Sequence, residues 1–481
     1  MKGLFYLYLA IIMTTYFKYL KDIRFWLILF FIIRLYGITN PPLDVAHNWR
    51  QTTVTMVARN YLEFDSRILY PRIDVCGEKS GITGMEFPIF NYLIFIISKL
   101  FGYQHWYGRA INLIISTIGI WFFYEIIRKY LNKNHAFASA MLLLGSIWFV
   151  YSRKIMPDTF AVSLVFIGIY YGLKYFYEKP AILNIALYTI FMLLGILAKL
   201  PMGYFLMVFA IPMFQKSISL KLKTVFGIVN LSIIGVVSWY YFRWVPYLIE
   251  HYGLKHFFMG KSITVGLIEI MKNWHSVLEK YYLDSMHITG FLLFLGGCWY
   301  AWKFRKTEPI TIWILGLCTS VFFLLMFKSG ETFAIHSYYI VPYAPIMAFV
   351  AGFAVTKLNY KWMPIILSIV IVENIANWQH DFRIKPEFAK FENLEKDLDK
   401  HGSRNDLIFV NSKEVPTPLY FAHRKGWSDH NHFVQNPQYV DSLQKLGLKY
   451  IVIAKKAFGS ATQLNYPKID SNDVYDIYKL K

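Results

Sequence analysis

The sequence contains few charged residues for its length, because Asp, Glu, Lys and Arg make up only 17% of its 481 residues. Soluble globular proteins carry about 25% charged and 45–50% apolar residues, whereas 56% of this chain is hydrophobic and 19% is aromatic. Runs at 25–33, 142–150 and 312–327 leave no polar face for a solvated helix. The composition excludes a cytosolic enzyme and a disordered chain, and it predicts a polytopic membrane protein.

Cysteine and glycine-rich loops are also scarce. The chain has three cysteines, and two of them, Cys298 and Cys318, lie in apolar segments, so that Cys76 has no evident disulfide partner. This pattern excludes a disulfide scaffold and a cysteine metal site. The sequence contains no GxGxxG or GxxxxGK[ST] motif, no internal repeat and no low-complexity tract. A nucleotide-binding loop is therefore excluded.

Hydrophobic segments predict the layout of the chain. We expect eleven transmembrane helices, at 22–38, 107–127, 135–152, 158–175, 180–198, 201–215, 224–244, 287–302, 309–327, 338–356 and 361–378. Segment 88–101 is too short for a comfortable span and predicts a juxtamembrane helix that begins near Pro88. Residues 1–21 lack the features of a cleaved signal peptide, and we expect a surface helix or an extension of the first helix.

Basic residues orient the predicted helices. If the N-terminus is cytoplasmic, the short cytoplasmic segments are rich in Lys and Arg and contain only three acidic residues, Asp22, Glu178 and Glu308. The Lys and Arg residues of these cytoplasmic segments account for much of the net charge of +20, and we expect no nucleic-acid partner. Segments 39–106, 153–158, 199–200, 245–286, 328–337 and 379–481 then share the outer face.

Two domains are expected. Residues 22–380 form the transmembrane domain, and residues 381–481 form a small α/β domain on the outer face. The second domain is predicted from short apolar strands at 407–410 and 450–454, from a helical pattern at 438–446 and from the closing segment 474–480.

Three acidic residues lie at the outer ends of the predicted spans: Asp44, Glu86 and Asp158. Charge at a membrane boundary is costly unless it is paired, solvated or used. Pro157 ends one helix and allows Asp158 to start the next, which is a favourable site for a carboxylate. On a helix, His47, Arg50 and Gln51 would share one face.

Basic residues accompany these acids on the same face: Arg50, Arg59, Arg153, Lys154 and Lys199. Carboxylates supply a general base or ligands for hard metals, and Arg and Lys bind phosphate. The alternative is that each acid caps a helix or pairs with the nearest base. From spacing alone, the sequence predicts an outward-facing site for an anionic ligand.

Four motifs in this order resemble the GT-C membrane glycosyltransferases, in the branch of the protein O-mannosyltransferases and the lipid A aminoarabinose transferase. They are Glu86-Phe87-Pro88, the segment from Arg153 to Asp158, the turn Lys199-Leu200-Pro201, and the stretch 336–345 that begins His336-Ser337-Tyr338-Tyr339. The similarity extends over roughly residues 22–360. It departs from the family where Asp44 has no acidic neighbour and where Phe87 follows Glu86 in place of a frequent Lys.

The resemblance implies transfer of a sugar from a polyprenyl-phosphate donor to a hydroxyl of a lipid, glycan or protein acceptor, with inversion at the sugar. It implies Asp44 as the catalytic base, with Glu86 and Asp158 orienting it or holding a divalent metal cation. The residues predicted to bind the donor phosphate are Arg50, Arg59, Arg153, Lys154, Lys199 and His336. Those predicted to line the lipid or substrate groove are His47, Trp49, Tyr338 and Tyr339.

Other functions remain compatible with the sequence. A polyprenyl-linked glycan ligase or polymerase would use a similar donor, and a flippase or transporter would place ionisable residues near the span centres. The chain instead places its acids at helix ends. The one N-x-[ST] sequon, Asn230-Leu231-Ser232, lies within a predicted span. We therefore expect a bacterial inner membrane, with the site and the C-terminal domain in the periplasm and membrane lipids as further partners.

Overall fold

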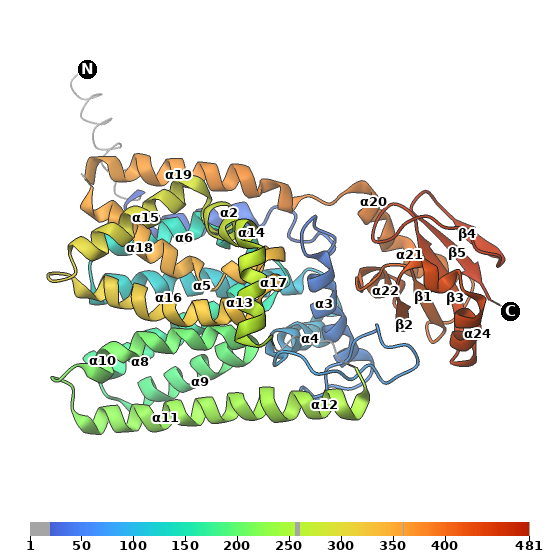
Figure 1. Cartoon of the computed structure of the whole chain (residues 1–481), viewed down its shortest axis with the longest axis horizontal. Helices are drawn as coiled ribbons and strands as arrows, with labels where there is room; N and C mark the ends of the chain where they lie inside the picture. Colours follow the sequence, from blue (N-terminus) through green and yellow to red (C-terminus); the bar gives the residue numbers. More distant parts are fainter. Residues whose placement is uncertain (1–19, 255–259, 359, 481) are drawn as a thin grey trace, which may run out of the picture.

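The computed structural model describes residues 20–254, 260–358 and 360–480. Long helices lie side by side and fill one end of the molecule, and a five-stranded sheet with short helices forms the other end (Figure 1). The chain is therefore a helical membrane domain with a small C-terminal α/β domain, as the sequence predicts. The predicted N-terminal surface segment lies, up to residue 19, outside the described residues.

Every predicted span coincides with one helix or with consecutive helices. They are α2 (Ile23–Arg34), α5 (Tyr107–Tyr130), α6 (Lys133–Gly145), α7 (Trp148–Tyr151), α8 (Pro157–Tyr177), α9 (Ile182–Ala198), the 3-10 helix η1 (Leu200–Phe209), α10 (Ala210–Phe214), α11 (Leu220–Trp239), the π-helix η2 (Tyr240–Trp244), α15 (His287–Lys303), α16 (Pro309–Ser329), the 3-10 helix η4 (Ser337–Ile340), α18 (Ala344–Lys357), η5 (Tyr360–Trp362) and α19 (Met363–Trp378).

Only four helical stretches in the described part are long and apolar enough by themselves to cross a membrane: Tyr107–Tyr130, Pro157–Tyr177, Leu220–Tyr252 and Pro309–Ser329. The other expected spans are shorter or broken. The span expected at 338–356, for example, is divided into η4 and α18. Pro342 and Pro345 lack the amide hydrogen that a continuous helix requires there.

Apolar side chains on the outside of the bundle fit a lipid environment. On α11, Ile228, Leu231 and Ile234 are about half exposed or more, although each is strongly hydrophobic. The connections between α10 and α11 and between α15 and α16 both lie at the end far from the C-terminal domain (Figure 1). This agrees with the predicted alternation of loops between two faces.

The helices of the long outer loops lie toward the end of the bundle that faces the C-terminal domain (Figure 1). They are α3 (Asn48–Glu63), α4 (Ile89–Phe101), α12 (Val245–Tyr252), α13 (Ile263–Lys272), α14 (Trp274–Glu279), the π-helix η3 (Lys280–Ser285) and α17 (Glu331–Ile335). The predicted juxtamembrane helix is α4. The expectation that His47 shares a helix face with Arg50 and Gln51 is wrong, because His47 precedes α3 and has a left-handed backbone with φ of 58°.

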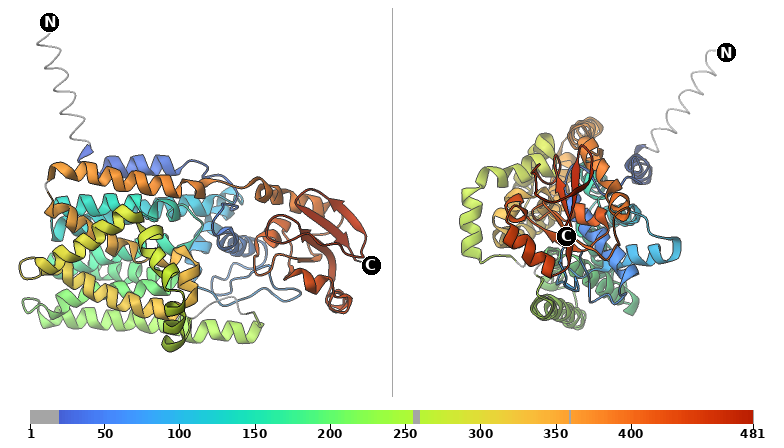
Figure 2. Two further views of the ribbon diagram at one scale, coloured as in Figure 1. Left: turned by 45° about the horizontal axis from the view of Figure 1, so that its top comes forward. Right: turned by 90° about the vertical axis from the view of Figure 1, so that its right-hand side faces the viewer.

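The C-terminal domain, which lies at one end of the molecule (Figure 2), contains a sheet with the strand order β2-β1-β3-β5-β4. Its elements are the 3-10 helix η6 (Gln379–Phe382), α20 (Pro386–Ala389), the 3-10 helix η7 (Lys390–Asn393), α21 (Leu394–Asp399), β1 (Leu407–Val410), α22 (Thr417–Ala422), β2 (Gly426–Ser428), α23 (Asn431–Val434), α24 (Pro437–Lys445), β3 (Leu448–Ala454), β4 (Lys468–Ser471) and β5 (Tyr475–Lys479). β1 pairs in parallel with β2 and β3, and β5 pairs antiparallel with β3 and β4.

Both faces of the sheet are covered. Along β3, Tyr450 and Val452 pack on one face and Ile451 and Ile453 on the other, as the two-residue period of a strand requires. The first face shares its core with residues of α3 and α4 and of the first outer loop. The C-terminal domain is thus packed onto the membrane domain, and the predicted boundary at residue 381 lies within η6.

The first outer loop also extends the sheet. Val75 pairs in parallel with Gly426, the first residue of β2. The Gly426 carbonyl accepts hydrogen bonds from the Cys76 and Gly77 amides at 3.0 and 2.8 Å. A Cβ atom at residue 426 would lie 1.8 Å from the Ile408 carbonyl oxygen, so this strand position requires glycine. The contact fixes the outer loop that leads to Glu86.

Candidate active site

A cavity of about 440 Å³ lies at the junction of the bundle, the outer loops and the C-terminal domain. Its charged lining residues are Arg50, Glu86, Asp158, Lys199, Lys328 and Glu414. Its aromatic lining residues are Trp49, Phe322, Phe333, His336, Tyr338 and Tyr339. The cavity therefore joins a polar floor to an apolar wall, as expected for an amphiphilic ligand.

Local structure explains why the polar residues meet here. Asp158 is the second residue of α8, directly after Pro157, where the free amides of the helix N-terminus favour a carboxylate. Lys199 ends α9 in an extended conformation, and Pro201 follows it. Glu86 lies just before α4 in the loop held by the sheet. All three charged residues therefore lie where a helix begins or ends.

The four charges of the floor alternate in sign. The Arg50 guanidinium donates a hydrogen bond to Glu86, and the Lys199 Nζ lies 3.2 Å from a Glu86 oxygen and 3.4 Å from an Asp158 oxygen. The four side chains are nearly buried. Such close contacts between opposite charges offset the free-energy cost of removing them from water.

The pKa values of two floor residues follow from this pairing. Burial alone raises the pKa of Glu86, but Arg50 and Lys199 lower it to about 2. Burial alone lowers the pKa of Lys199, whereas Asp158 and Glu86 raise it above its ordinary value. Glu86 and Lys199 are both charged at neutral pH.

Asp158 differs from Glu86 in its hydrogen bonds. It is 1% exposed, and neither carboxylate oxygen accepts a hydrogen bond from any residue in the described part of the chain. Its one ionic contact is the longer one to Lys199. A buried carboxylate with free lone pairs at a cavity wall is able to accept a proton or a hydrogen bond from a ligand.

Asp44 does not line this cavity. Its carboxylate lies 2.9 Å from the Arg109 guanidinium and accepts a hydrogen bond from the Gln51 amide at 3.1 Å. Burial alone raises the pKa of Asp44, but Arg109, Lys154 and Arg153 lower it. The Gln51 carbonyl oxygen in turn accepts from the Ile155 amide. Asp44 therefore ties α3 and α5 to the loop that precedes Asp158.

Arg153 and Lys154 also point away from the cavity. The Lys154 Nζ lies 3.2 Å from an Asp381 oxygen and donates to the Ala46 carbonyl at 3.0 Å. The Arg153 guanidinium lies over the Phe382 ring, 4.2 Å from its centroid. Both cations contact η6, which follows α19 directly.

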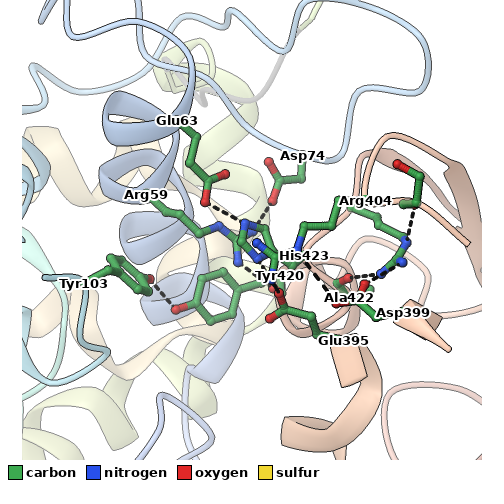
Figure 3. A network of polar contacts seen from close by, with 12 residues as sticks. Arg59, Glu63, Asp74, Tyr103, Glu395, Asp399, Arg404, Tyr420, Ala422 and His423 are labelled. Carbon is green, nitrogen blue, oxygen red and sulfur yellow. Dashed lines mark hydrogen bonds and ion pairs between the residues drawn. The ribbon is translucent and has the colours of Figure 1, made fainter. Parts of the chain in front are cut away.

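Arg59 belongs to a second cavity, of about 310 Å³, between α3 and the C-terminal domain. Figure 3 shows it between the Asp74 carboxylate, at 2.7 Å, and the Tyr420 carbonyl, at 3.0 Å. Beside it, His423 contacts Glu63 of α3 and Glu395 of α21, each at 2.7 Å. This network joins the two domains. Arg59 lies on the same helix as Arg50, but it shares no partner with the residues of the floor.

The residues predicted for the groove gather in an aromatic cluster. Trp49, His336, Tyr338 and Tyr339 line the cavity, whereas His47 lies behind them and contacts the Ser337 hydroxyl at 3.2 Å. Burial and nearby cations lower the pKa of His47 to about 3 and also lower that of His336. Both imidazoles are neutral at neutral pH, so His336 contributes hydrogen bonding rather than charge.

Known proteins resemble the chain in sequence and in structure. The dolichyl-phosphate-mannose-protein mannosyltransferase family matches residues 86–242. ArnT from Cupriavidus metallidurans, solved in the apo state, has a TM-score of 0.61 at 14% identity, over 94% of this chain and 97% of that one. The same protein bound to undecaprenyl phosphate has a TM-score of 0.59 at 14% identity, over 94% and 98%.

An oligosaccharyltransferase from Archaeoglobus fulgidus shares the fold as well. Its apo form has a TM-score of 0.58 at 12% identity, over 89% of this chain and 70% of that one. No curated protein sequence matches the chain. The family match and the structural matches thus point to the same group of membrane proteins.

The chain has a GT-C fold.

The family match covers part of the site. It begins at Glu86 and includes Asp158 and Lys199, but it excludes Arg50 and His336. The latter two residues reach the same cavity only through the fold. The predicted catalytic and binding roles of all of these residues stay predictions.

Two charged residues of the GT-C site escaped the sequence analysis. Lys328 lies in the last turn of α16, and Glu414 lies in the turn between β1 and α22. Nothing in the sequence around Lys328 distinguishes it from other lysines at the ends of spans. Glu414 is exposed and far from the membrane domain in sequence, so only the docking of the C-terminal domain reveals it.

A metal site was a further expectation, with Glu86 and Asp158 as the ligands. The described ranges contain no group of three or more close His, Cys, Asp or Glu side chains that fits a metal ion. The Lys199 ammonium lies between the two carboxylates, where a bridging cation would bind. The Archaeoglobus fulgidus oligosaccharyltransferase that shares the fold was also solved with Zn and sulfate.

Proposed function

We propose that the protein transfers a sugar from a polyprenyl-phosphate donor to an acceptor hydroxyl at the periplasmic face of a bacterial inner membrane. The observation that carries the proposal is the cavity in which the Arg50-Glu86-Lys199-Asp158 series meets an apolar wall. The similar ArnT was solved with undecaprenyl phosphate, and an Archaeoglobus fulgidus oligosaccharyltransferase with dolichol-phosphate. Both ligands join one phosphate to a long apolar chain.

Charge pairing indicates how the donor phosphate would bind. Arg50 and Lys199 are balanced by Glu86 and Asp158, so these four residues add little net charge. Lys328 has no carboxylate partner in the described ranges, and its Nζ donates only to the Lys261 carbonyl, at 3.3 Å. Lys328 thus supplies the extra positive charge for the phosphate, with Arg50 and Lys199 as hydrogen-bond donors.

The apolar wall supports binding of the lipid chain. Phe322, Leu325 and Met326 of α16 line the cavity, and α16 is one of the four helices apolar enough to cross a membrane. The lipid chain would follow this helix into the bilayer, while the phosphate stays near Lys328 at its outer end.

The transfer itself needs a base and a stabilised leaving group. The acceptor oxygen attacks the anomeric carbon, the bond from that carbon to the phosphate oxygen breaks, and its electron pair leaves with the phosphate. In-line attack inverts the anomeric centre. The hydroxyl proton passes to a carboxylate, for which Asp158 is favoured over Glu86, because a carboxylate with a pKa of about 2 is a weak base.

Asp44 then receives a positioning role in place of the base role that the resemblance implies. Its contacts to Arg109 and Gln51 hold the loop before Asp158. No step of this scheme passes through a metal ion, since Lys199 occupies the position between Glu86 and Asp158.

Lipid binding and turnover test the proposal directly. The purified protein is mixed with undecaprenyl phosphate and with its glycosylated form, and binding is followed by native mass spectrometry. We expect one bound lipid and transfer of the sugar to an added acceptor lipid extract. Lys328→Gln should weaken binding about tenfold, the effect of losing about 1.4 kcal/mol.

Lys272→Gln is the matched control, because this exposed lysine ends α13 and does not line the cavity. Equal binding by both variants would remove Lys328 from the phosphate site. Specific binding of a polyprenyl diphosphate that carries a long glycan, without binding of the monophosphate, would contradict the proposal in favour of a ligase or polymerase.

A further inference from the structure

We propose that Glu414 of the C-terminal domain recognises the acceptor, by accepting hydrogen bonds from its hydroxyl groups. The inference rests on the proposed function and assigns the C-terminal domain a part in it. Glu414 is the cavity-lining residue contributed by that domain; the others come from the membrane domain and its outer loops.

A rigid turn holds Glu414. The Ser412 hydroxyl donates to the Val415 carbonyl at 2.8 Å, and the Val415 amide donates to the Ser412 carbonyl at 2.9 Å. Lys413 has a left-handed backbone with φ of 55°, and its amide donates to the Asp429 carbonyl. The turn therefore fixes the backbone position from which the Glu414 side chain extends.

The turn is also docked at a defined place on the membrane domain. Three residues after Glu414, the Thr417 hydroxyl of α22 lies 3.2 Å from the Asn48 amide oxygen and 3.1 Å from the Thr52 hydroxyl. These two residues flank Trp49 and Arg50 on α3, which line the cavity. Buried hydrogen bonds thus place Glu414 beside the polar floor.

Charge and position favour the acceptor as the ligand of Glu414. Glu414 forms no ion pair within residues 20–254, 260–358 and 360–480, and it is exposed, whereas Asp158 is buried at the floor. A free carboxylate repels a donor phosphate, but it accepts hydrogen bonds from hydroxyl groups. Glu414 belongs to the C-terminal domain, whereas the donor chain would follow α16 of the membrane domain.

The experiment compares donor hydrolysis with transfer in proteoliposomes that contain a radiolabelled undecaprenyl-phosphate sugar. The acceptor probe is octyl glucoside, an amphiphile with several hydroxyl groups. We expect Glu414→Gln to retain donor binding and hydrolysis within about twofold and to raise the KM for octyl glucoside about tenfold. Asp441→Asn, which neutralises an exposed carboxylate of α24 away from the cavity, should leave both unchanged.

The outcomes separate this inference from the proposed function. Donor that is neither bound nor consumed by the wild-type protein would overturn the proposed function. Donor consumption with the same KM for Glu414→Gln and Asp441→Asn would overturn the role of Glu414 alone. Equal loss of donor hydrolysis and transfer in Glu414→Gln, with unchanged thermal unfolding, would also overturn it, since that result places Glu414 in the chemical step.

Discussion

At the scale of single residues, the carboxylates near the cavity differ in what already binds them. Glu86 is paired with two cations and Asp44 is paired with Arg109, so that of the three predicted catalytic acids only Asp158 accepts no hydrogen bond from the residues described. All three acids lie near the site, but only Asp158 has carboxylate oxygens that are available to accept a proton.

We expect Asp158→Asn to lower kcat about 10³-fold, because an amide cannot take the acceptor proton. The fold should remain stable, since Lys199 keeps its contact with Glu86. The measurement is the single-turnover rate of sugar transfer, together with the thermal unfolding midpoint in detergent.

Asp44→Asn provides the comparison. It leaves Arg109, which is fully buried, without its countercharge, so we expect a loss of about 3 kcal/mol in the free energy of unfolding. A stable Asp44→Asn protein with no activity, beside an active Asp158→Asn protein, would return the base role to Asp44.

At the scale of elements, small residues allow the bundle helices to pack closely. A Cβ atom at Gly119 of α5 would lie 2.3 Å from the Ser163 hydroxyl oxygen of α8. Close backbone approach through small residues is a common source of helix association in membranes.

We therefore expect Gly119→Val to reduce the free energy of unfolding by about 2 kcal/mol through overpacking. Gly227→Val in α11 is the matched control, because no atom lies within 4 Å of a Cβ built there. Thermal unfolding in one detergent measures both variants, and equal midpoints would show that the α5–α8 contact tolerates a larger side chain.

The contact between α3 and α21 through His423 predicts a pH dependence. Burial alone lowers the pKa of His423, but hydrogen bonds to Glu395 and Glu63 raise it, and the pKa values of both carboxyls are lowered. The stabilisation by charged His423 is complete below its unfolded pKa of about 6.5 and is lost as the pH rises through the raised folded value. The carboxylates lose their share as the pH falls below about 4.3.

We expect wild type to exceed His423→Gln in stability by about 1 kcal/mol near pH 5.5, with the difference shrinking above pH 7. Thermal unfolding of both proteins between pH 5 and 9 measures it. A difference that grows with pH would contradict a charged His423 between the two carboxylates.

At the scale of the whole molecule, the two domains share one hydrophobic core and a sheet edge. Met56, Val57 and Ile73 of the membrane domain pack with Leu419 and Val452 of the C-terminal domain. Removing residues 386–481 would expose this core and release the loop that pairs with β2.

We expect the truncated protein to be cleaved by trypsin in its first outer loop, at Arg67 or Arg72, at least tenfold faster than the intact chain. Donor hydrolysis should fall with it, because the same loop leads to Glu86. Limited proteolysis in membranes measures the cleavage. Unchanged cleavage and full donor hydrolysis would show that the membrane domain folds by itself.

Much of this architecture follows from local sequence. Hydrophobic segments predict where the helices lie, since burial in lipid depends on composition, and proline predicts where α8 begins. β1 and β3 follow from short apolar runs and α24 from a helical pattern, whereas β2 and β4 were not predicted. The lengths of the spans are less predictable, because 3-10 and π turns and internal prolines divide segments that composition alone treats as continuous.

The site was predictable only in part. Residue types and order were sufficient to select Glu86, Asp158, Lys199, Arg50 and the aromatic residues of 336–339, all of which line the cavity. Arg59, Arg153 and Lys154 have the same residue types, yet they pair with Asp74, Phe382 and Asp381. A charge in sequence does not reveal which countercharge lies beside it.

The sequence by itself determined the membrane location, the helical class, the C-terminal α/β domain and most of the polar residues of the site, because these depend on composition and on neighbouring residues. Only the tertiary structure decided which acid is free to accept a proton and that Lys328 and Glu414 reach the same cavity. These properties depend on contacts between segments up to hundreds of residues apart, and such contacts form only when the domains dock.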